Sequence, residues 1–417
     1  MDTERLMGLL EERGWTCHFE PEMPQAPVMI INTCGFIGDA KEESINTILQ
    51  QSLRKRARRN RLEQLYVMGC LSQRYMEDLT HEIPEVDGWF GKFDFTGILD
   101  RLDSTGKSIQ SCLLRHITTP KHYAYLKISE GCNRMCSYCA IPLITGRHQS
   151  RPMEEILDEV KWLRTQGVKE LNVIAQDLSS YGLDIYKEHK LPELIDRMAQ
   201  IEGIEWIRLH YAYPTDFPEA LLDVMARHNN VCKYLDIALQ HCTDHMLSLM
   251  RRHITQAEQD ALIAHIRERI PGICIRTTLM VGHPGETEED FAALKEWTRS
   301  MRFDRMGAFA YSEEEGTYAA THYTDDIPED VKQCRLSELM AIQQDISAEL
   351  QAQKEGQTFR VIIDREEDDY YIGRTEFDSP EVDCEVLIDK KQRLNIGDFY
   401  NATITKAEEF DLYAQIC

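Results

Sequence analysis

The pattern of apolar and polar positions divides the chain into three zones. The first zone, residues 1–108, opens on an amphipathic helical stretch and continues with two apolar runs, APVMIINTCGF and LEQLYVMGC. Each run leads into a helical stretch. Apolar strands that alternate with helices are typical of a parallel sheet with helices on both faces. We therefore expect a doubly wound parallel α/β domain here.

The second zone, residues 118–349, repeats the strand–helix pattern six times. Six such units predict a partial (β/α)6 barrel of the TIM type, with functional side chains at the carboxyl ends of the strands. A long helix beginning at Pro328 closes the zone. The expected strands are Tyr123–Ser129, Leu171–Ala175, Trp206–His210, Tyr234–Leu239, Cys274–Val281 and Met306–Tyr311. The expected helices are Met153–Gln166, Leu191–Ile201, Phe217–Arg227, Ala257–Ile270 and Glu288–Met301.

The third zone, residues 352–417, has short runs of alternating polar and apolar residues with turn residues between them. This pattern predicts a small antiparallel β-barrel. The whole chain is therefore expected to be of the α/β class, with a β-barrel at its carboxyl end.

The composition restricts the cellular compartment and the kinds of partner that the protein can have. The chain has 47 Lys and Arg against 71 Asp and Glu, a net charge of −24. Such a chain repels nucleic-acid phosphates unless its basic residues are segregated, and it attracts basic proteins. It shows no apolar run long enough for a membrane span and no secretion signal, so we expect a cytoplasmic protein with no membrane partner. Thirteen cysteines in such a chain favour metal or redox use of some thiols over disulfides.

The strongest chemical signal is the stretch GCNRMCSYCAIP, directly after the first expected barrel strand. Its cysteines Cys132, Cys136 and Cys139 have the spacing CxxxCxxC, and no second cysteine or histidine pair follows at zinc-ligand spacing. Three closely spaced soft thiolates suit an iron–sulfur cluster better than zinc or an unmetallated loop. A four-iron cluster held by three thiolates leaves one iron open to a small molecule.

This stretch resembles the radical S-adenosylmethionine superfamily. The resemblance implies that the open iron binds S-adenosylmethionine and that an electron from the cluster cleaves it to a 5′-deoxyadenosyl radical. It also implies that residues at the ends of expected strands bind this cofactor. His241, His283 and Gly285 lie at the same strand ends. A structural role would fit each of these positions equally well when taken alone. The implied cofactor-binding residues are Tyr138, Gln176, Asp177, Gln240 and Gly282.

Two further cysteines, Cys34 and Cys70, end apolar runs in the first zone. Alone, they would read as two buried thiols. Their surroundings, INTCGFI and GCLSQRY, together with the third zone, resemble the methylthiotransferase subfamily of radical S-adenosylmethionine enzymes. The resemblance implies an N-terminal methylthiotransferase domain at 1–108, a radical core at 118–349 and a TRAM domain at 352–417. It also implies two 4Fe–4S clusters, the second bound in part by Cys34 and Cys70.

The same subfamily binds its second cluster through a further cysteine in a Gly-Cys-Ser loop, which precedes a helix. This sequence starts inside that helix, and Cys17 does not match the missing ligand. We therefore expect one strand and one loop to be absent from the sequence as written, which leaves two thiolates for the second cluster.

Two branches of the subfamily differ in substrate: one modifies an adenosine of tRNA, the other the β-carbon of an aspartate in ribosomal protein S12. From Lys354 onward the chain has 8 Lys and Arg against 16 Asp and Glu, a net charge of −8, which disfavours tRNA. The resemblance also favours the protein substrate. The stretch YSEEEGTYAA has glutamates where the tRNA branch tends to carry Arg and Pro, and DSPEVD resembles an acidic segment of the branch that modifies S12. They make Glu381 and Asp383 candidates for contact with the partner, although a solvated acidic turn fits them equally well.

A basic run argues the other way, although such runs are usually solvated helix faces. We therefore expect an S12 methylthiotransferase, with a tRNA enzyme or an inactive ribosome-docking module as alternatives. The sequence assigns neither the sulfur donor nor the electron donor. The basic run consists of Arg54, Lys55, Arg56, Arg58, Arg59 and Arg61.

Overall fold

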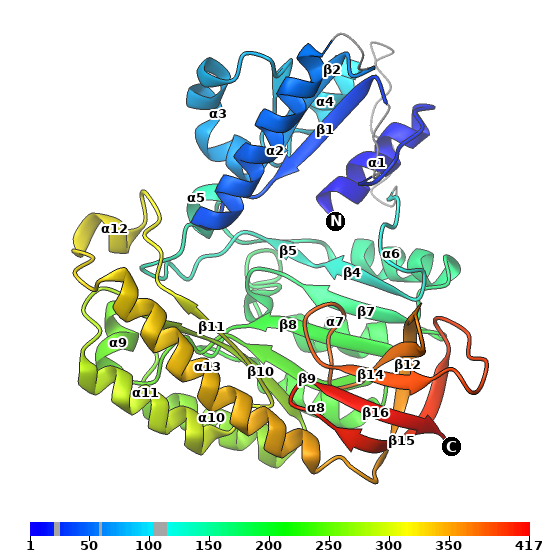
Figure 1. The fold of residues 1–417 in the computed structure, drawn as a ribbon, viewed down its shortest axis with the longest axis vertical. Coiled ribbons are helices and arrows are strands. Elements are labelled where there is room, and N and C mark those ends of the chain that lie inside the picture. Colours follow the sequence, from blue (N-terminus) through cyan, green and yellow to red (C-terminus); the bar gives the residue numbers. More distant parts are fainter. Residues whose placement is uncertain (21–25, 58–60, 103–114) are drawn as a thin grey trace.

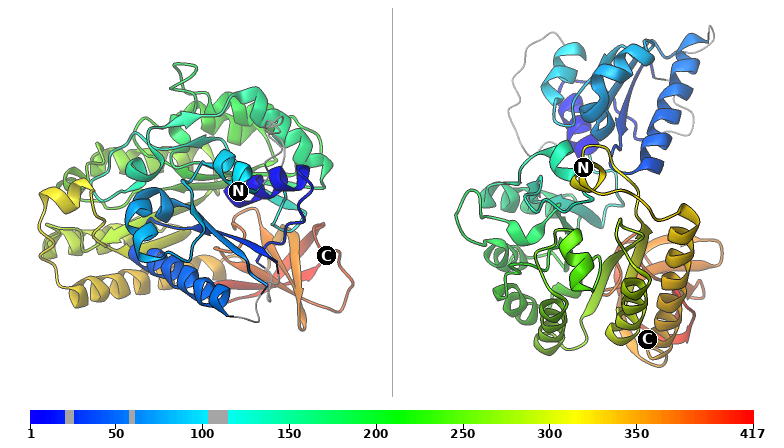
Figure 2. Two further views of the ribbon diagram at one scale, coloured as in Figure 1. Left: turned by 90° about the horizontal axis from the view of Figure 1, so that it is seen from above. Right: turned by 90° about the vertical axis from the view of Figure 1, so that its left-hand side faces the viewer.

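The computed structural model describes residues 1–20, 26–57, 61–102 and 115–417 (Figure 1). The expected boundary at residue 108, and the residues Arg58, Arg59 and Cys112, lie outside the described residues. An N-terminal lobe sits above a six-stranded α/β unit, and a small β-barrel packs against the lower part of that unit (Figures 1 and 2). Within the described residues, none of the helices combines the length and the apolar content that a membrane crossing requires.

The N-terminal lobe is built on a parallel sheet in the order β1-β2-β3. Alternate residues of its middle strand pack on opposite faces: Tyr66 and Met68 join one apolar core, Leu65 and Val67 the other. The doubly wound arrangement expected here is confirmed. The strands are β1 (Val28–Thr33), β2 (Gln64–Gly69) and β3 (Gly88–Trp89), and the helices are α1 (Asp2–Glu12), α2 (Gly38–Arg56), α3 (Cys70–Glu82) and α4 (Phe95–Leu102).

The central unit is an open parallel sheet in the order β11-β10-β9-β8-β7-β4, so the expected incomplete barrel is also confirmed. Helices cover its outer face (Figure 1). Its strands are β4 (Tyr123–Lys127), β7 (Glu170–Ile174), β8 (Trp206–Ala212), β9 (Val231–Ile237), β10 (Cys274–Val281) and β11 (Arg305–Ala310). Its longer helices are α6 (Met153–Thr165), α7 (Leu191–Ala199), α8 (Ala220–Arg227), α10 (Gln256–Arg269), α11 (Glu288–Met301) and α13 (Glu329–Ala352). Shorter elements are β5 (Ser129–Glu130), α5 (Ile141–Thr145), β6 (Gln149–Ser150), the 3-10 turn Leu178–Ser180, α9 (Asp244–Leu249) and α12 (Tyr318–His322).

The two faces of this sheet differ in polarity. Leu126, Leu235 and Ile275 belong to the apolar core beneath the helices. Their neighbours along the strands therefore face the inside of the barrel, since successive side chains of a strand point to opposite faces. Among those neighbours are Asp236 and Arg276. The inner face is polar, as a chamber for chemistry requires.

The C-terminal unit is a closed barrel in the order β12-β13-β14-β16-β15. Four of its five strand pairs are antiparallel, as expected, but β14 and β16 run parallel. The strands are β12 (Thr358–Glu367), β13 (Tyr370–Thr375), β14 (Glu385–Asp389), β15 (Phe399–Ala407) and β16 (Asp411–Ile416).

This small barrel closes the amino ends of the central strands through buried polar contacts. Arg374 pairs with Glu170 at 2.7 Å, and Arg305 pairs with Asp378 at 2.6 Å. Asp383 accepts a hydrogen bond from the Tyr234 hydroxyl at 2.9 Å and pairs with Arg276 at 3.3 Å. With its side chain only 3% exposed, Asp383 holds the two units together. The expectation that it contacts a partner protein is therefore wrong, because its charge is spent inside the chain.

Candidate functional site

The three-cysteine loop lies between the short strand β5 and helix α5. It turns sharply at Gly131, whose φ is +75° and where a side chain would collide with the carbonyl oxygen of Arg147. The amide of Cys139 donates to the carbonyl of Cys136 at 3.1 Å, and the amide of Cys132 donates to that of Gly146 at 3.3 Å. These bonds hold the three thiols on one tight loop, just beyond the carboxyl end of β4.

Donors and a buried cation surround these sulfurs. The guanidinium of Arg252, itself 2% exposed, donates to Cys136 Sγ at 3.4 Å and to the Tyr138 hydroxyl at 3.4 Å. The amide of Arg134 donates to Cys132 Sγ, also at 3.4 Å. Donors and a positive charge at this distance stabilise thiolate sulfur. Arg252 could not be predicted from the sequence, because it lies far along the chain and has no motif around it.

The electrostatics of the loop fit an iron–sulfur cluster. Burial raises the pKa of Cys132 to about 11 and that of Cys139 to about 12, so both thiols are protonated at neutral pH without metal. Bound iron supplies the positive charge that offsets desolvation of the thiolates. Among the described residues, no group of three or more His, Cys, Asp or Glu side chains has an arrangement that could hold a single metal ion. A cluster does not need that arrangement, because each thiolate binds a different iron.

Gln176 and Asp177 follow β7 and turn toward this loop. The Gln176 amide nitrogen donates to Glu130 at 3.0 Å, and Asp177 accepts from Arg134 Nε at 2.7 Å. Each keeps one oxygen that is buried and has no hydrogen-bond partner, Gln176 Oε1 and Asp177 Oδ1. Unpaired buried acceptors are costly, which is a sign that a donor from a ligand belongs there. Their cofactor-binding role stays a prediction, and these two orphaned oxygens favour it.

Gln240 and Gly282 lie at neighbouring strand ends in unusual backbone conformations, with φ of +71° and +73°. The Gly282 amide donates to Glu286 at 2.7 Å, and a side chain at this position would overlap Lys332 of α13. The chain therefore needs glycine here for its own packing. Whether Gly282 also approaches a cofactor stays a prediction, as it does for Gln240.

His241 and His283 are fully buried and serve the fold. His283 accepts from the Ser137 hydroxyl at 3.0 Å through Nε2, while its Nδ1 bonds the Pro284 carbonyl at 3.0 Å. His241 bonds Glu286 at 3.3 Å. His283 thus supports the cysteine loop from below, through the residue between Cys136 and Tyr138.

Acid should weaken this support. Burial lowers the pKa of His283 from 6.5 to about 4. Its stabilising effect is therefore complete above pH 6.5 and is lost as the pH falls toward 4. From pH 6.5 to 5 the metal-free chain should lose about 2 kcal/mol of unfolding free energy through this group, at about 1.4 kcal/mol per pH unit. Urea unfolding at both pH values measures the loss. His283→Gln should lack that portion, and an unchanged pH dependence in the variant would refute the assignment.

Cys34 and Cys70 lie together at the carboxyl edge of the N-terminal sheet. Cys34 follows β1, and Cys70 is the first residue of α3. A side chain on Gly35 would collide with the backbone of Cys70 and Leu71, so the two cysteine segments touch. Burial raises the pKa of Cys70, Lys92 lowers it, and the nearby Cys34 raises it further. The structure brings these two cysteines to one place, as expected.

Polar side chains connect this place to the barrel. Lys92 of the N-terminal lobe pairs with Glu130 at 3.1 Å, and Glu130 also accepts from Gln176. Lys127 of β4 pairs with Asp2 at 2.7 Å. The signal that could have revealed Lys127 from the sequence is a lysine that ends an otherwise uncharged strand, directly after the buried Leu126.

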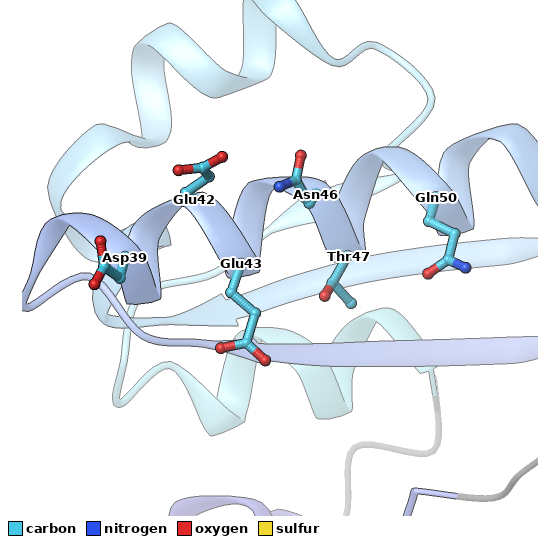
Figure 3. A pocket seen from close by; sticks show the side chains of 6 residues that line it. All are labelled: Asp39, Glu42, Glu43, Asn46, Thr47 and Gln50. Atoms are coloured by element: carbon cyan, nitrogen blue, oxygen red, sulfur yellow. The ribbon is translucent and has the colours of Figure 1, made fainter.

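Two other surfaces of the N-terminal lobe carry less chemistry. A shallow groove runs along α2, and all of its labelled side chains belong to that one helix (Figure 3). A larger cavity of about 1140 Å³ lies between α1 and β1 and has Cys34 in its wall. In the described part of the basic run, Lys55 pairs with Asp87 and Arg56 pairs with Glu85. These two side chains form ion pairs within the lobe, which weakens the hypothesis that the basic run binds RNA.

Comparison with known proteins agrees with this architecture. Family models match at residues 1–91 (uncharacterized protein family UPF0004), 126–298 (radical SAM superfamily) and 356–417 (TRAM domain). The ribosomal protein uS12 methylthiotransferase RimO of Phocaeicola vulgatus is 60% identical over all of this chain and 96% of its own length. The RimO protein of Bacteroides thetaiotaomicron is 61% identical over all of this chain and 95% of its own length. The chain belongs to the RimO family. It is a radical S-adenosylmethionine methylthiotransferase, and that family implies a 4Fe–4S cluster and S-adenosylmethionine.

Solved structures support the fold. The radical S-adenosylmethionine methyltransferase TsrM of Kitasatospora setae, with cobalamin and a 4Fe–4S cluster bound, has a TM-score of 0.52 at 15% identity. The match covers 70% of this chain and 63% of TsrM. At this identity the likeness concerns the fold alone.

Proposed function

We propose that this protein methylthiolates the β-carbon of an aspartate in ribosomal protein uS12. The observation that carries the proposal is that the N-terminal lobe, with Cys34 and Cys70 at one edge of its sheet, is joined through Lys92 and Glu130 to the barrel rim. That rim carries Cys132, Cys136 and Cys139. RimO relatives, named for uS12, cover the full chain. A cytoplasmic location would follow from a ribosomal substrate.

We propose that Cys132, Cys136 and Cys139 bind the first 4Fe–4S cluster, within a core domain at 118–349. When bound, that cluster supplies the electron that cleaves S-adenosylmethionine to an adenosyl radical. Arg252 holds positive charge and a donor against Cys136 Sγ. The unpaired oxygens of Gln176 and Asp177 would accept from the ammonium group of S-adenosylmethionine, while Tyr138, Gln240 and Gly282 would line the remainder of its site. The apolar helix layer keeps water from the outer face of the sheet.

A second 4Fe–4S cluster is proposed at Cys34 and Cys70, in an N-terminal domain at 1–108. The juxtaposition of their segments and the nearby Lys92 support it, because a cation stabilises sulfur anions. These two residues supply two thiolates. The sulfur of the methylthio group would be held here, opposite the barrel mouth.

The TRAM domain, proposed at 352–417, favours a basic protein over tRNA. Its net charge from Lys354 onward is −8. Asp383 and Asp378 form ion pairs within the chain. The attraction for a basic protein therefore comes from the remaining exposed carboxylates. Glu381 remains exposed but accepts a hydrogen bond from Tyr123, so it too has a role within the chain.

The test is product formation on two substrates. The chain, reconstituted with iron and sulfide without oxygen, is supplied with S-adenosylmethionine, sulfide and a chemical reductant. It is then incubated with purified uS12 or with unmodified tRNA. We expect one methylthio group on an aspartate of uS12, found by mass spectrometry of the digested protein, and none on tRNA. Methylthioadenosine in the tRNA with no change in uS12 would refute the proposed substrate. Absence of 5′-deoxyadenosine in both reactions would refute the proposal that this chain cleaves S-adenosylmethionine.

A further inference from the structure

The acidic stretch after β11 joins the two cysteine groups. Glu314 is buried, with its side chain 4% exposed, and it lies on the rim of the central barrel. Its carboxylate receives two cations from the N-terminal lobe: Lys41 at 2.8 Å and Arg74 at 3.2 Å. Two cations on one buried carboxylate make a directed contact between the lobes, unlike an exposed ion pair.

Arg74 ties this contact to both cysteines of the N-terminal lobe. It sits on α3, the helix that begins with Cys70. Its Nη1 donates to the carbonyl of Gly35, next to Cys34, at 3.2 Å, and its Nη2 donates to the carbonyl of Glu315 at 2.7 Å. One planar guanidinium therefore links the Cys34 segment, the Cys70 helix and the barrel rim. Lysine could not span these acceptors at once, because it lacks the rigid fork of donors.

The other end of the same stretch reaches the three-cysteine loop. The Glu314 carbonyl accepts from the amide and the hydroxyl of Thr317, which caps α12. In that short helix, the amide of Ala319 donates to the carbonyl of Ser137 at 2.7 Å. Ser137 lies between Cys136 and Tyr138 and is fully buried. Hydrogen bonds and the six consecutive rim residues 314–319 thus connect the segments of Cys34 and Cys70 with Ser137, which is next to Cys136.

We propose that residues 314–319 form a bracket that sets the position of the N-terminal cysteine segments relative to the three-cysteine loop. Glu314 and Arg74 are positioning residues in this scheme. The reaction must bring a sulfur-bearing group and a substrate radical together in one place, and small misplacement is costly in such steps. The catalytic role of the bracket rests on the proposed function of the two cysteine sites. The contacts that form the bracket do not depend on that function.

The first test needs no cofactor. Hydrogen exchange is followed by mass spectrometry on the metal-free chain for the wild type, Glu314→Gln and Arg74→Lys. Both variants should speed exchange by about tenfold in residues 33–41 and also in 136–141, because loss of one end loosens the other. The matched control is Glu4→Gln. Glu4 is equally buried and pairs with Arg115 at 2.7 Å, but it contacts neither cysteine segment. Its effect should stay within α1 and residues 115–118.

The second test measures coupling in the reconstituted enzyme. Glu314→Gln and Arg74→Lys should keep 5′-deoxyadenosine formation within about twofold but lower methylthiolated uS12 per 5′-deoxyadenosine by about fivefold or more. Glu4→Gln should keep the wild-type ratio. Unchanged exchange at 136–141 in both variants, or an equal fall of the ratio in Glu4→Gln, would overturn the bracket. If the wild type makes no 5′-deoxyadenosine, the proposed function fails, and the exchange experiment still decides the bracket.

Discussion

Replacing Cys136 by alanine should abolish 5′-deoxyadenosine formation, with a fall of at least about 10³-fold, because the group that supplies the electron can no longer be held. Cys136 is the most buried of the three loop cysteines and accepts a hydrogen bond from the buried Arg252. Removing its sulfur also leaves that cation without one of its partners. Iron content after anaerobic reconstitution should drop by about four atoms per chain relative to the wild type.

The wild-type baseline of this experiment reports on the second site. About eight irons per chain would mean that Cys34 and Cys70 hold a second cluster, and about four would mean that only the barrel loop does. The matched control is Cys242→Ala, since Cys242 is a fully buried thiol outside the loop. It should cost some stability yet retain iron and 5′-deoxyadenosine formation. A Cys136→Ala chain that keeps both would contradict the assignment of the loop.

The features that could be predicted from the sequence are those that repeat or cluster locally. The six central strands were predictable because each combines a short apolar run with a following helix. Cys132, Cys136 and Cys139 were predictable because their spacing alone restricts the chemistry. Their neighbours were not: Arg252 reaches Cys136 across 116 residues of chain, and nothing around it in the sequence marks it.

Acidic residues show the limit of sequence reasoning most clearly. Glu314 and Asp383 both belong to stretches that favour a basic partner when only charge is counted. The structure buries both and pairs each with arginine of another unit. Charge can be read from a sequence, but burial depends on which distant segments pack there, and burial decides whether a carboxylate attracts a partner or joins two domains.

Replacing Arg374 by alanine should cost about 3–5 kcal/mol of unfolding free energy, because it leaves buried carboxylates without their main cation. Arg374 is 2% exposed and binds both oxygens of Glu170, at 2.7 and 3.1 Å. It also pairs with Asp364 at 2.6 Å. Burial alone would raise the pKa of Glu170, but Arg374 and Arg208 outweigh it and bring that pKa below 4.5. The carboxylate therefore stabilises the fold above pH 4.5, and this stabilisation is lost as the pH falls through the lowered pKa.

The cost of Arg374→Ala should accordingly be largest near pH 7 and should shrink in acid, because protonated Glu170 needs no cation. Urea unfolding at pH 7 and at pH 4 measures both values. Arg360→Ala is the matched control: it removes another arginine between the same two units, paired with Glu205 at 2.7 Å but with both side chains more than 40% exposed. An exposed pair is worth about 0–1 kcal/mol.

Equal losses for the two variants would contradict the view that buried charge holds the small barrel against the amino ends of the central strands. A larger loss for Arg374→Ala would locate that attachment at Glu170, at the amino ends of the strands and away from the cysteine loop at their carboxyl ends. The two ends of one barrel would then have separate tasks, since the amino ends anchor the TRAM unit and the carboxyl ends carry the chemistry.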